Sequence, residues 1–235
     1  MNTATVVAGT GIGLAARGHL PQQYHEIALA AVGLGTLGLG LKMFTASRNV
    51  LIPVGALIFG GLLGHFLGLQ AGIEALGAWA KGTFGGGGRI EEAFVTTSIL
   101  FCVGPMTLLG CLEDGLEGKI HLLGIKSILD GISSVFFAAA LGWGVLLSAV
   151  TVLVVQGSLT LSARRLRPLL SRRDVLDETT AAGGGILLAI GIGLLGLRSL
   201  PSADFLPALV LAGAVAWRFG SGELEQVAPG SLPDE

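Results

Sequence analysis

The sequence predicts an all-α, polytopic transmembrane helical bundle of about eight spans. Composition gives the first reason: 51% of the residues are hydrophobic, only 13% are charged, and the mean hydropathy is +0.77, far above that of a water-exposed surface. The second is that long apolar runs alternate with short polar, proline-containing or charged clusters. Because one crossing needs about 20 apolar residues, 235 residues hold roughly eight crossings and no catalytic domain outside the bilayer.

The apolar runs place the expected spans at residues 3–17, 25–45, 50–69, 91–112, 121–141, 143–163, 178–198 and 203–219. Residues 70–84 are expected to form a short interfacial helix with Trp79 as its anchor. Four glycines at 85–88 should interrupt the helix before the fourth span, and the polar tail at 220–235 should be disordered. The sixth span begins directly at Gly142–Gly144, without a polar loop. All spans are expected to belong to one transmembrane domain.

The distribution of charge predicts an orientation. The net charge is −2 and no basic patch is interleaved with aromatics, which argues against a nucleic-acid partner. Cytoplasmic loops keep an excess of Lys and Arg, so the loop with the densest basic cluster is expected inside, with both termini on the same side. This places the following basic residues inside: Lys42, Arg48, Lys119, Arg164, Arg165, Arg167, Arg172, Arg173 and Arg218. Only Arg17, Lys81, Arg89 and Arg198 are left outside.

Metal and cofactor sites are not expected. Cys102 and Cys111 lie in one apolar stretch without zinc spacing, so they are interpreted as small hydrophobes. None of the four histidines has a second ligand at zinc spacing. The segment GTGIGL at 9–14 contains Gly-x-Gly but lacks the preceding strand of a dinucleotide-binding motif. The glycines are expected instead to allow close helix approach in lipid, as at Gly33, Gly60, Gly64, Gly68, Gly184 and Gly193.

An internal repeat is visible in the sequence. The chain reads VVAGTGIGLAARG, HE and ALAAVGLGTLGLGL near its start, and VVQGSLTLSARR, DE and TTAAGGGILLAIGIGL later. The copies begin at the first and sixth spans, so they should have opposite orientations, as in many secondary transporters. Residues 1–69 and 143–219 are the predicted units, with residues 91–142 as central spans; chance similarity of glycine-rich helices is the alternative. The matched pairs are Gly9 and Gly157, Thr10 and Ser158, Arg17 and Arg165, Glu26 and Glu178, Gly33 and Gly185, and Pro53 and Pro207.

The fifth span carries the main candidate site. Lys126 and Asp130 lie one helical turn apart, followed by Ser133 and Ser134. A charge in hydrocarbon costs about 2.5 to 3.5 kcal/mol on insertion scales, so these residues should face the bundle interior, a partner or water. In the alternative, Lys126 snorkels to the headgroups and Asp130 merely packs against another polar group. The functional interpretation makes them ligands of an ion or substrate.

The fourth span adds Thr97, Ser98 and an expected break at Gly104–Pro105. Proline removes a backbone donor and clashes with the preceding turn, so carbonyl groups should be freed near mid-membrane, where they can bind a cation or substrate. A simple packing kink with the carbonyls satisfied by neighbouring hydroxyls is the alternative.

The sixth and seventh spans supply three further candidates. Gln156 and Ser158 belong to a polar set that spreads around the sixth span, which indicates a central helix, although interhelical hydrogen bonding alone would explain it. Glu178, like Glu26, opens a glycine-rich span. Capping of that helix is the plain explanation, and ligand binding is the functional one.

Several long segments resemble a known family. They are FVTTSILFCVGPMTLLGCLEDGL, KSILDGISSVFFAAALGWGVLLSA, VVQGSLTL and DETTAAGGGILLAIGIGL. The chain is similar over nearly its whole length to the YqgA/YdfK-like family of uncharacterised bacterial membrane proteins, domain of unknown function 554. Pro105 departs from the small residue, such as Ala, expected at that position. The resemblance implies the bacterial inner membrane and, at most, a transporter.

We therefore expect a secondary transporter or channel for an ion or small polar solute, with its pathway between the inverted units. A non-transporting scaffold or regulator is the main alternative, in which polar groups only join helices. A membrane-embedded enzyme is disfavoured, because no His-Glu-x-x-His or Gly-x-Ser-x-Gly motif occurs. The expected partners are lipid and an unidentified solute, with a homo-oligomer left open.

The topology can be tested by labelling single cysteines from outside the cell. Cysteines placed at residues 116, 170 and 230 should be protected, whereas one at residue 20 should react, because the basic clusters hold their loops in the cytoplasm. Labelling at 170 without labelling at 20 would reverse the orientation.

Overall fold

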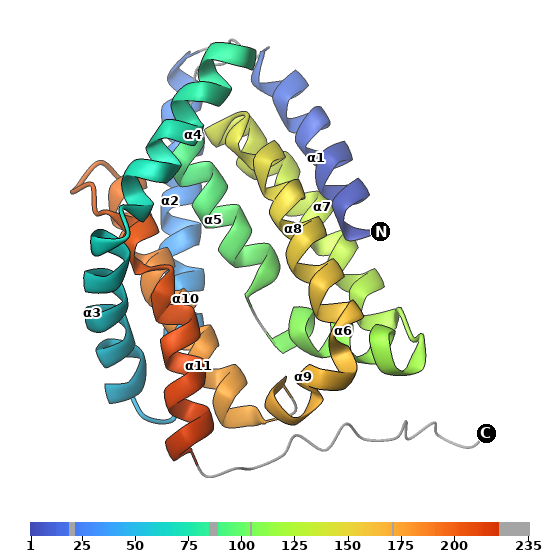
Figure 1. Cartoon of the computed structure of the whole chain (residues 1–235). Helices are drawn as coiled ribbons and strands as arrows, with labels where there is room; N and C mark the ends of the chain where they lie inside the picture. Colours follow the sequence, from blue (N-terminus) through green and yellow to red (C-terminus); the bar gives the residue numbers. More distant parts are fainter. Residues whose placement is uncertain (19–21, 85–88, 104, 171, 221–235) are drawn as a thin grey trace.

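The computed structural model describes residues 1–18, 22–84, 89–103, 105–170 and 172–220. These residues form an all-α bundle, as the sequence predicts (Figure 1). The glycine run at 85–88, Gly104, His19 and the tail beyond Gly220 lie outside the described residues. In chain order the elements are α1 (Asn2–Arg17), α2 (Gln22–Phe44), α3 (Leu51–Phe66), α4 (Leu69–Phe84), α5 (Ile90–Cys102), α6 (Pro105–Glu117), α7 (His121–Leu141), α8 (Gly144–Leu161), α9 (Ala163–Leu170), α10 (Arg173–Leu194), the 3-10 turn η1 (Ser202–Phe205) and α11 (Pro207–Phe219).

Within the described residues, five helical segments are long and apolar enough to cross a membrane: Glu26–Phe44, His121–Leu141, Gly144–Leu161, Arg173–Leu194 and Ser202–Phe219. The number rises to seven if each of two bent pairs counts as one span. Leu51–Phe66 and Leu69–Ala75 meet at 60°, and Ile90–Cys102 and Met106–Glu117 meet at 54°. The one expected span that remains is the first, at residues 3–17. It corresponds to α1, whose 16 residues are fewer than a full crossing requires.

The structure changes the bounds of two expected spans and adds a helix to one expected loop. The span expected at 178–198 is α10, which begins earlier, at Arg173, and has the favourable carboxylate of Asp174 in its first turn. The span expected at 91–112 is divided into α5 and α6 by the expected break beside Pro105, and α6 continues to Glu117. The basic loop contains the helix α9, whose Ala163 and Leu166 pack with Leu112 and Leu176. Burial of these two side chains favours a helix that the charges alone do not indicate.

The helices form two groups on either side of α5 (Figure 1). One group contains α2, α3, α10 and α11, and the other contains α1, α7 and α8. The largest apolar core joins them, since it includes Val95 and Ile99 of α5, Leu141 and Val145 around the α7–α8 turn, and Ile186 of α10. The turn itself forms at Gly142, whose φ of 91° disfavours side chains, so the two abutting spans are separate as expected.

Glycines set the closest helix contacts. In the second group, Gly9 and Gly13 of α1 lie against the carbonyls of Gly131 and Val135 on α7, so these two helices run parallel. In the first group, Gly184 of α10 lies against the backbone of α2, and the α2–α10 pair runs antiparallel. Gly33, Gly60 and Gly64 also make close contacts, as expected. Gly68 instead forms a turn at φ 66°, and Gly193 meets no neighbouring helix closely, so the expectation is wrong for these two.

The structure does not confirm the inverted repeat. The paired helices α2 and α10 do run in opposite directions, as such a repeat requires. Matched residues nevertheless have different surroundings, because Glu26 is exposed whereas Glu178 is buried. Gly9 is closely packed whereas Gly157 faces open space. The repeat therefore stays a prediction.

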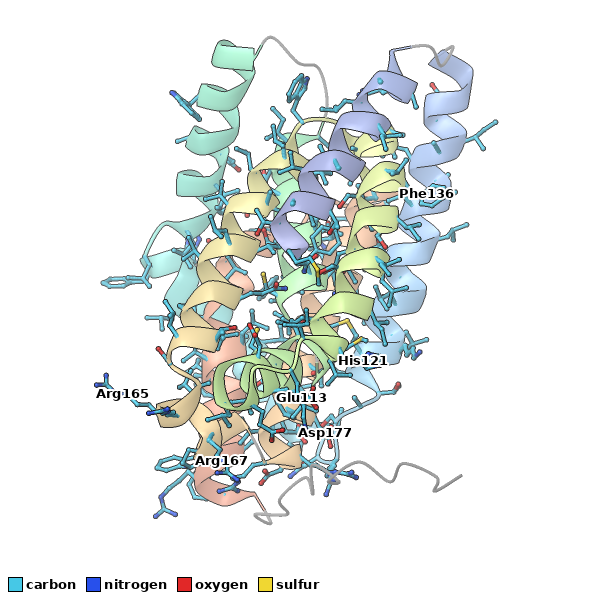
Figure 2. The ribbon with its side chains drawn as sticks, turned by 90° about the vertical axis from the view of Figure 1, so that its right-hand side faces the viewer. Glu113, His121, Phe136, Arg165, Arg167 and Asp177 are labelled. Atoms are coloured by element: carbon cyan, nitrogen blue, oxygen red, sulfur yellow. The ribbon has the colours of Figure 1, made fainter. Side chains whose placement is uncertain are left out.

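The basic residues assigned to the cytoplasm gather at one end of the bundle. Figure 2 shows Arg165, Arg167 and Asp177 at this end, and the Arg48 side chain bonds the Asp177 carboxylate at 3.0 Å. At the opposite end, Arg17 donates to the Ala140 carbonyl and Arg89 to the Gly193 carbonyl. We call the first end the basic end. Its assignment to the cytoplasm stays a prediction.

Substitution of Gly184 by Ala should destabilise the bundle by about 1 to 3 kcal/mol, because an added Cβ would overlap the backbone of Gly40 and Phe44. Gly38→Ala is the matched control, since a Cβ there meets nothing within 4 Å. The measurement is equilibrium unfolding in mixed micelles. Equal unfolding midpoints for the two variants would contradict the assigned α2–α10 contact.

Candidate functional site

The Lys126–Asp130 pair is buried within the bundle. Asp130 lies nine residues after the start of α7, about 14 Å along its axis. The Lys126 ammonium bonds the Asp130 carboxylate at 2.5 Å, and the two side chains are 11% and 3% exposed. Lys126 also donates to the Leu100 carbonyl of α5 at 3.3 Å and lies 5.7 Å from the centre of the Phe101 ring. These contacts direct the ammonium inward, so it does not snorkel to the surface.

Two amides from other helices complete the cluster. Asn2 of α1 donates its side-chain amide to the Asp130 carboxylate at 2.8 Å and to the Gln156 side-chain oxygen at 3.2 Å. Gln156 of α8 then donates to the Phe101 carbonyl at 3.3 Å. The cluster of Asn2, Lys126, Asp130 and Gln156, which we call the polar cluster, thus joins α1, α5, α7 and α8.

The break between α5 and α6 explains why the Phe101 carbonyl can accept hydrogen bonds from side chains. In an uninterrupted helix, this carbonyl would accept the N–H of residue 105, but Pro105 has none. Gln156 and the Thr107 hydroxyl, at 3.0 Å, donate to it instead. The carbonyl is therefore freed from the helix as expected, but a neighbouring hydroxyl and the Gln156 amide already donate to it, as the alternative of a packing kink expects. The break brings α5 into the polar cluster.

Two cavities adjoin the polar cluster. The first, of about 380 Å³, is bordered by Asn2 and Gln156 and by Asp114, Ile120 and Leu161 near the basic end. The second, of about 450 Å³, is bordered by Lys126 and Asp130 and lies between α2 and α7, with α5 and α10 behind it. We call them the end cavity and the side cavity. Members of the polar cluster thus line both cavities, Asn2 and Gln156 the first and Lys126 and Asp130 the second.

The chain has known relatives. A family model described as "Protein of unknown function (DUF554)" matches residues 1–217. The chain belongs to the DUF554 family. It is 28% identical to the uncharacterized membrane protein YdfK of Bacillus subtilis (strain 168), over 91% of this chain and 93% of the relative. It is also 28% identical to the uncharacterized protein YqgA of Escherichia coli (strain K12), over 90% and 92%.

No solved structure matches this DUF554 chain. The family resemblance noted in the sequence is confirmed, and the name of one relative, together with the apolar helices, supports a membrane protein. Neither relative is named for a substrate or an activity. The chemistry of this family member must therefore be argued from its own residues.

The remaining candidates lie at varying distances from the polar cluster. Ser133 borders the side cavity, and the Ser134 hydroxyl bonds the backbone carbonyl of Asp130 at 2.7 Å. Thr97 is buried and bonds the Ala93 carbonyl of its own helix. The buried Ser98 hydroxyl has no hydrogen-bond partner among the described residues. Ser158 is outside the cluster and bonds its own helix at Val155.

Glu178 lies away from the polar cluster and anchors the α2–α3 turn. Its carboxylate accepts the Ser47 hydroxyl at 2.7 Å and the backbone N–H groups of Arg48 and Asn49 at 2.9 and 3.1 Å. The expected capping of its own helix is wrong, because the carboxylate reaches the neighbouring turn. All these donors belong to the protein, so this geometry indicates a structural role.

Two other buried acids also anchor helix ends. Asp204 accepts the backbone N–H of Gln70 at the start of α4 and contacts His65 at 3.2 Å. Asp174 pairs with Arg172, whose guanidinium donates to the last carbonyls of α11. Asp130 differs from all three, because it lies in the middle of a helix and opens onto a cavity.

Sequence reasoning missed Asn2 and Thr96. Thr96 borders the side cavity, is 1% exposed, and its hydroxyl has no hydrogen-bond partner among the described residues. A polar residue at the start of an apolar span was the only signal for Asn2. Spacing along α1 cannot reveal its partners, because they depend on the parallel packing of α1 on α7. Within the described residues, no three His, Cys, Asp or Glu side chains gather as a metal site requires.

Removal of either charge of the pair should destabilise the protein. Asp130→Asn and Lys126→Met should each cost about 3 to 5 kcal/mol, because each leaves an uncompensated buried charge. The double variant should cost less than the sum, since it removes both charges together. Double-mutant unfolding in micelles measures the coupling. Asp177→Asn is the control at an exposed pair and should cost less than about 1 kcal/mol. Additive effects at positions 126 and 130 would contradict the pairing.

Proposed function

We propose that this DUF554 protein is a carrier that moves an ion or small polar solute through the polar cluster. The observation that supports it best is the position of the Lys126–Asp130 pair, which is mid-helix and buried, borders the side cavity, and is bonded through Asn2 to the residues that border the end cavity. Intramembrane charges are expensive and persist mainly where they serve a pathway or a partner. The other buried acids of the bundle are accounted for by helix ends, whereas Asp130 is not.

The cluster is built so that it can open. Its four side chains are joined by hydrogen bonds from α1, α7 and α8, with only backbone carbonyls contributed by α5. Exchange of the Asn2–Asp130 and Gln156–Phe101 bonds for bonds to a solute would connect the end cavity with the side cavity. Pro105 cannot donate to the Phe101 carbonyl, so a bond from the Thr107 side chain stands there in place of a helix hydrogen bond, and the α5–α6 junction can serve as a hinge. Such a step would admit solute from one cavity at a time.

The membrane and orientation form part of the proposal. We place the protein in the bacterial inner membrane with the basic end in the cytoplasm, on the strength of the Lys and Arg bias. The end cavity then opens toward the cytoplasmic side, where Asp114 borders it. The side cavity opens between α2 and α7.

A scaffold role makes a different prediction for the same residues. All four members of the polar cluster bond groups of the protein itself, as interhelical fastening would require. Fastening alone does not account for the two cavities that these groups border. Measurement of flux decides between the two functions.

Reconstituted wild-type protein should carry at least one of a defined set of probes faster than protein-free liposomes. Protons are followed with an internal pH dye under Na⁺ or K⁺ gradients, and acetate, alanine, glycerol and urea by light scattering. Lys126→Met/Asp130→Asn should reduce this flux to the protein-free level, because it removes both charges while leaving no unpaired one. Asp177→Asn should retain the wild-type flux.

Unfolding midpoints of the same preparations provide the structural control. Equal flux in the wild type and in a folded double variant would reject Lys126 and Asp130 as the transport site. Flux no greater than in protein-free liposomes for every probe would favour the scaffold instead.

A further inference from the structure

The side cavity has the form of a ligand site rather than a packing defect. Its volume of about 450 Å³ lies within the range of small-molecule sites in proteins. Its walls come from four helices, with Val32, Leu129, Phe137 and Leu187 as apolar contributors. Gly35 of α2 and Leu129 of α7 are exposed on the outer surface as well as lining the cavity. A molecule can therefore reach the cavity from the side, between α2 and α7.

Two polar groups that border this cavity have a hydrogen to donate to a ligand. The Lys126 ammonium has three N–H groups and donates to two acceptors, Asp130 and Leu100, among the described residues. The Thr96 hydroxyl is buried and has no partner there. Thr36, on the facing wall, already donates to the Val32 carbonyl at 2.8 Å. A ligand that accepts from Lys126 and Thr96 together must bring acceptor atoms, and a negative head suits the ammonium once Asp130 is neutralised.

Asp130 is a poor receptor for a cation from the same cavity. Its two oxygens already accept hydrogen bonds from Lys126 and Asn2. An arriving cation would face the Lys126 ammonium at close range, and like charges repel strongly where water is excluded. An arriving anion would in turn face Asp130, which borders the same cavity, so it fits only together with a proton that neutralises this carboxylate. The single Lys126 ammonium is then left to match one negative charge rather than the two or more of a phosphate ester. These contacts favour a singly charged anion that arrives with a proton.

We propose that the side cavity binds a small amphipathic monocarboxylate, with its carboxylate at Lys126 and Thr96 and its alkyl chain along Val32, Leu129, Phe137 and Leu187. The apolar walls bury the chain, and the paired donors fix the head. This inference rests on the proposed function, for which it names the substrate class. One proton taken up by the Asp130 carboxylate would balance the added negative charge, so the acid and a proton would occupy the site together.

The test uses a short alkanoate that carries a photoreactive diazirine, with the full-length protein in lipid nanodiscs. Mass spectrometry should locate the crosslink on residues of α2, α5 or α7 that border the side cavity. Hexanoate should compete for the site, whereas hexylamine and hexanol should not, because they lack the carboxylate. Thr96→Val should weaken hexanoate competition by about two- to tenfold, the value of one hydrogen bond.

A matched pair of glycine variants tests the location. Gly35→Leu should abolish the specific crosslink, since it adds a side chain at the mouth of the cavity where a Cβ meets no neighbour. Gly38→Leu lies one turn further along α2, also in open space and outside the cavity lining, and should leave labelling unchanged. Both substitutions should preserve the unfolding midpoint.

The outcomes separate this inference from the proposed function. Competition by hexylamine or hexanol equal to that by hexanoate would show only an apolar crevice and would overturn the inference, as would a crosslink insensitive to Gly35→Leu. Flux that depends on Lys126 and Asp130 without hexanoate binding would leave the carrier standing and remove this substrate class. Specific hexanoate binding without flux would keep the site and reject the carrier.

Discussion

The ion pair between Lys126 and Asp130 determines what the neighbouring helices must supply. In a water-poor bundle, two charges persist only if each also has polar partners beyond the other. Asn2 provides one for the carboxylate and the Leu100 carbonyl provides one for the ammonium. The first can arrive only because Gly9 and Gly13 let α1 pack closely on α7, and the second only because α5 ends near Cys102. The close packing of α1 on α7 and the end of α5 thus each supply one partner of the Lys126–Asp130 pair.

The buried acids among the described residues have two kinds of surroundings. Glu178, Asp174 and Asp204 each meet free backbone groups at a turn or helix end, where a carboxylate is a favourable partner. Glu178 and Asp204 join segments distant in sequence, and Asp174 bonds Arg172, whose guanidinium reaches the end of α11. Asp130 meets side chains instead, in the middle of a long helix, and borders a cavity. Bonds between side chains can be exchanged for bonds to a solute more readily than a helix end can be released.

Small residues and cavities complement each other in this architecture. Where glycines bring backbones together, as at α2–α10 and α1–α7, dispersion contacts are dense and the helices are held in register. The side cavity lies at the boundary between the two helix groups, where α2 faces α7. Its lining side chains range in size from Gly35 to Phe137. Rigid pairs on either side of a looser boundary are a suitable basis for a carrier, since groups of helices can move as units.

The sequence by itself determined the membrane-embedded α-helical class, most helix positions, the Lys126–Asp130 pair and the break at Pro105. Each follows from local physics: the length of apolar runs, the cost of a charge in hydrocarbon, and the missing N–H of proline. Only the tertiary structure decided that Asn2 and Gln156 join the pair, that Thr96 borders a cavity, and that Glu178 anchors a turn. These depend on which helices pack together and in which register, and sequence separations of 128 and 154 residues carry no local signal of that choice.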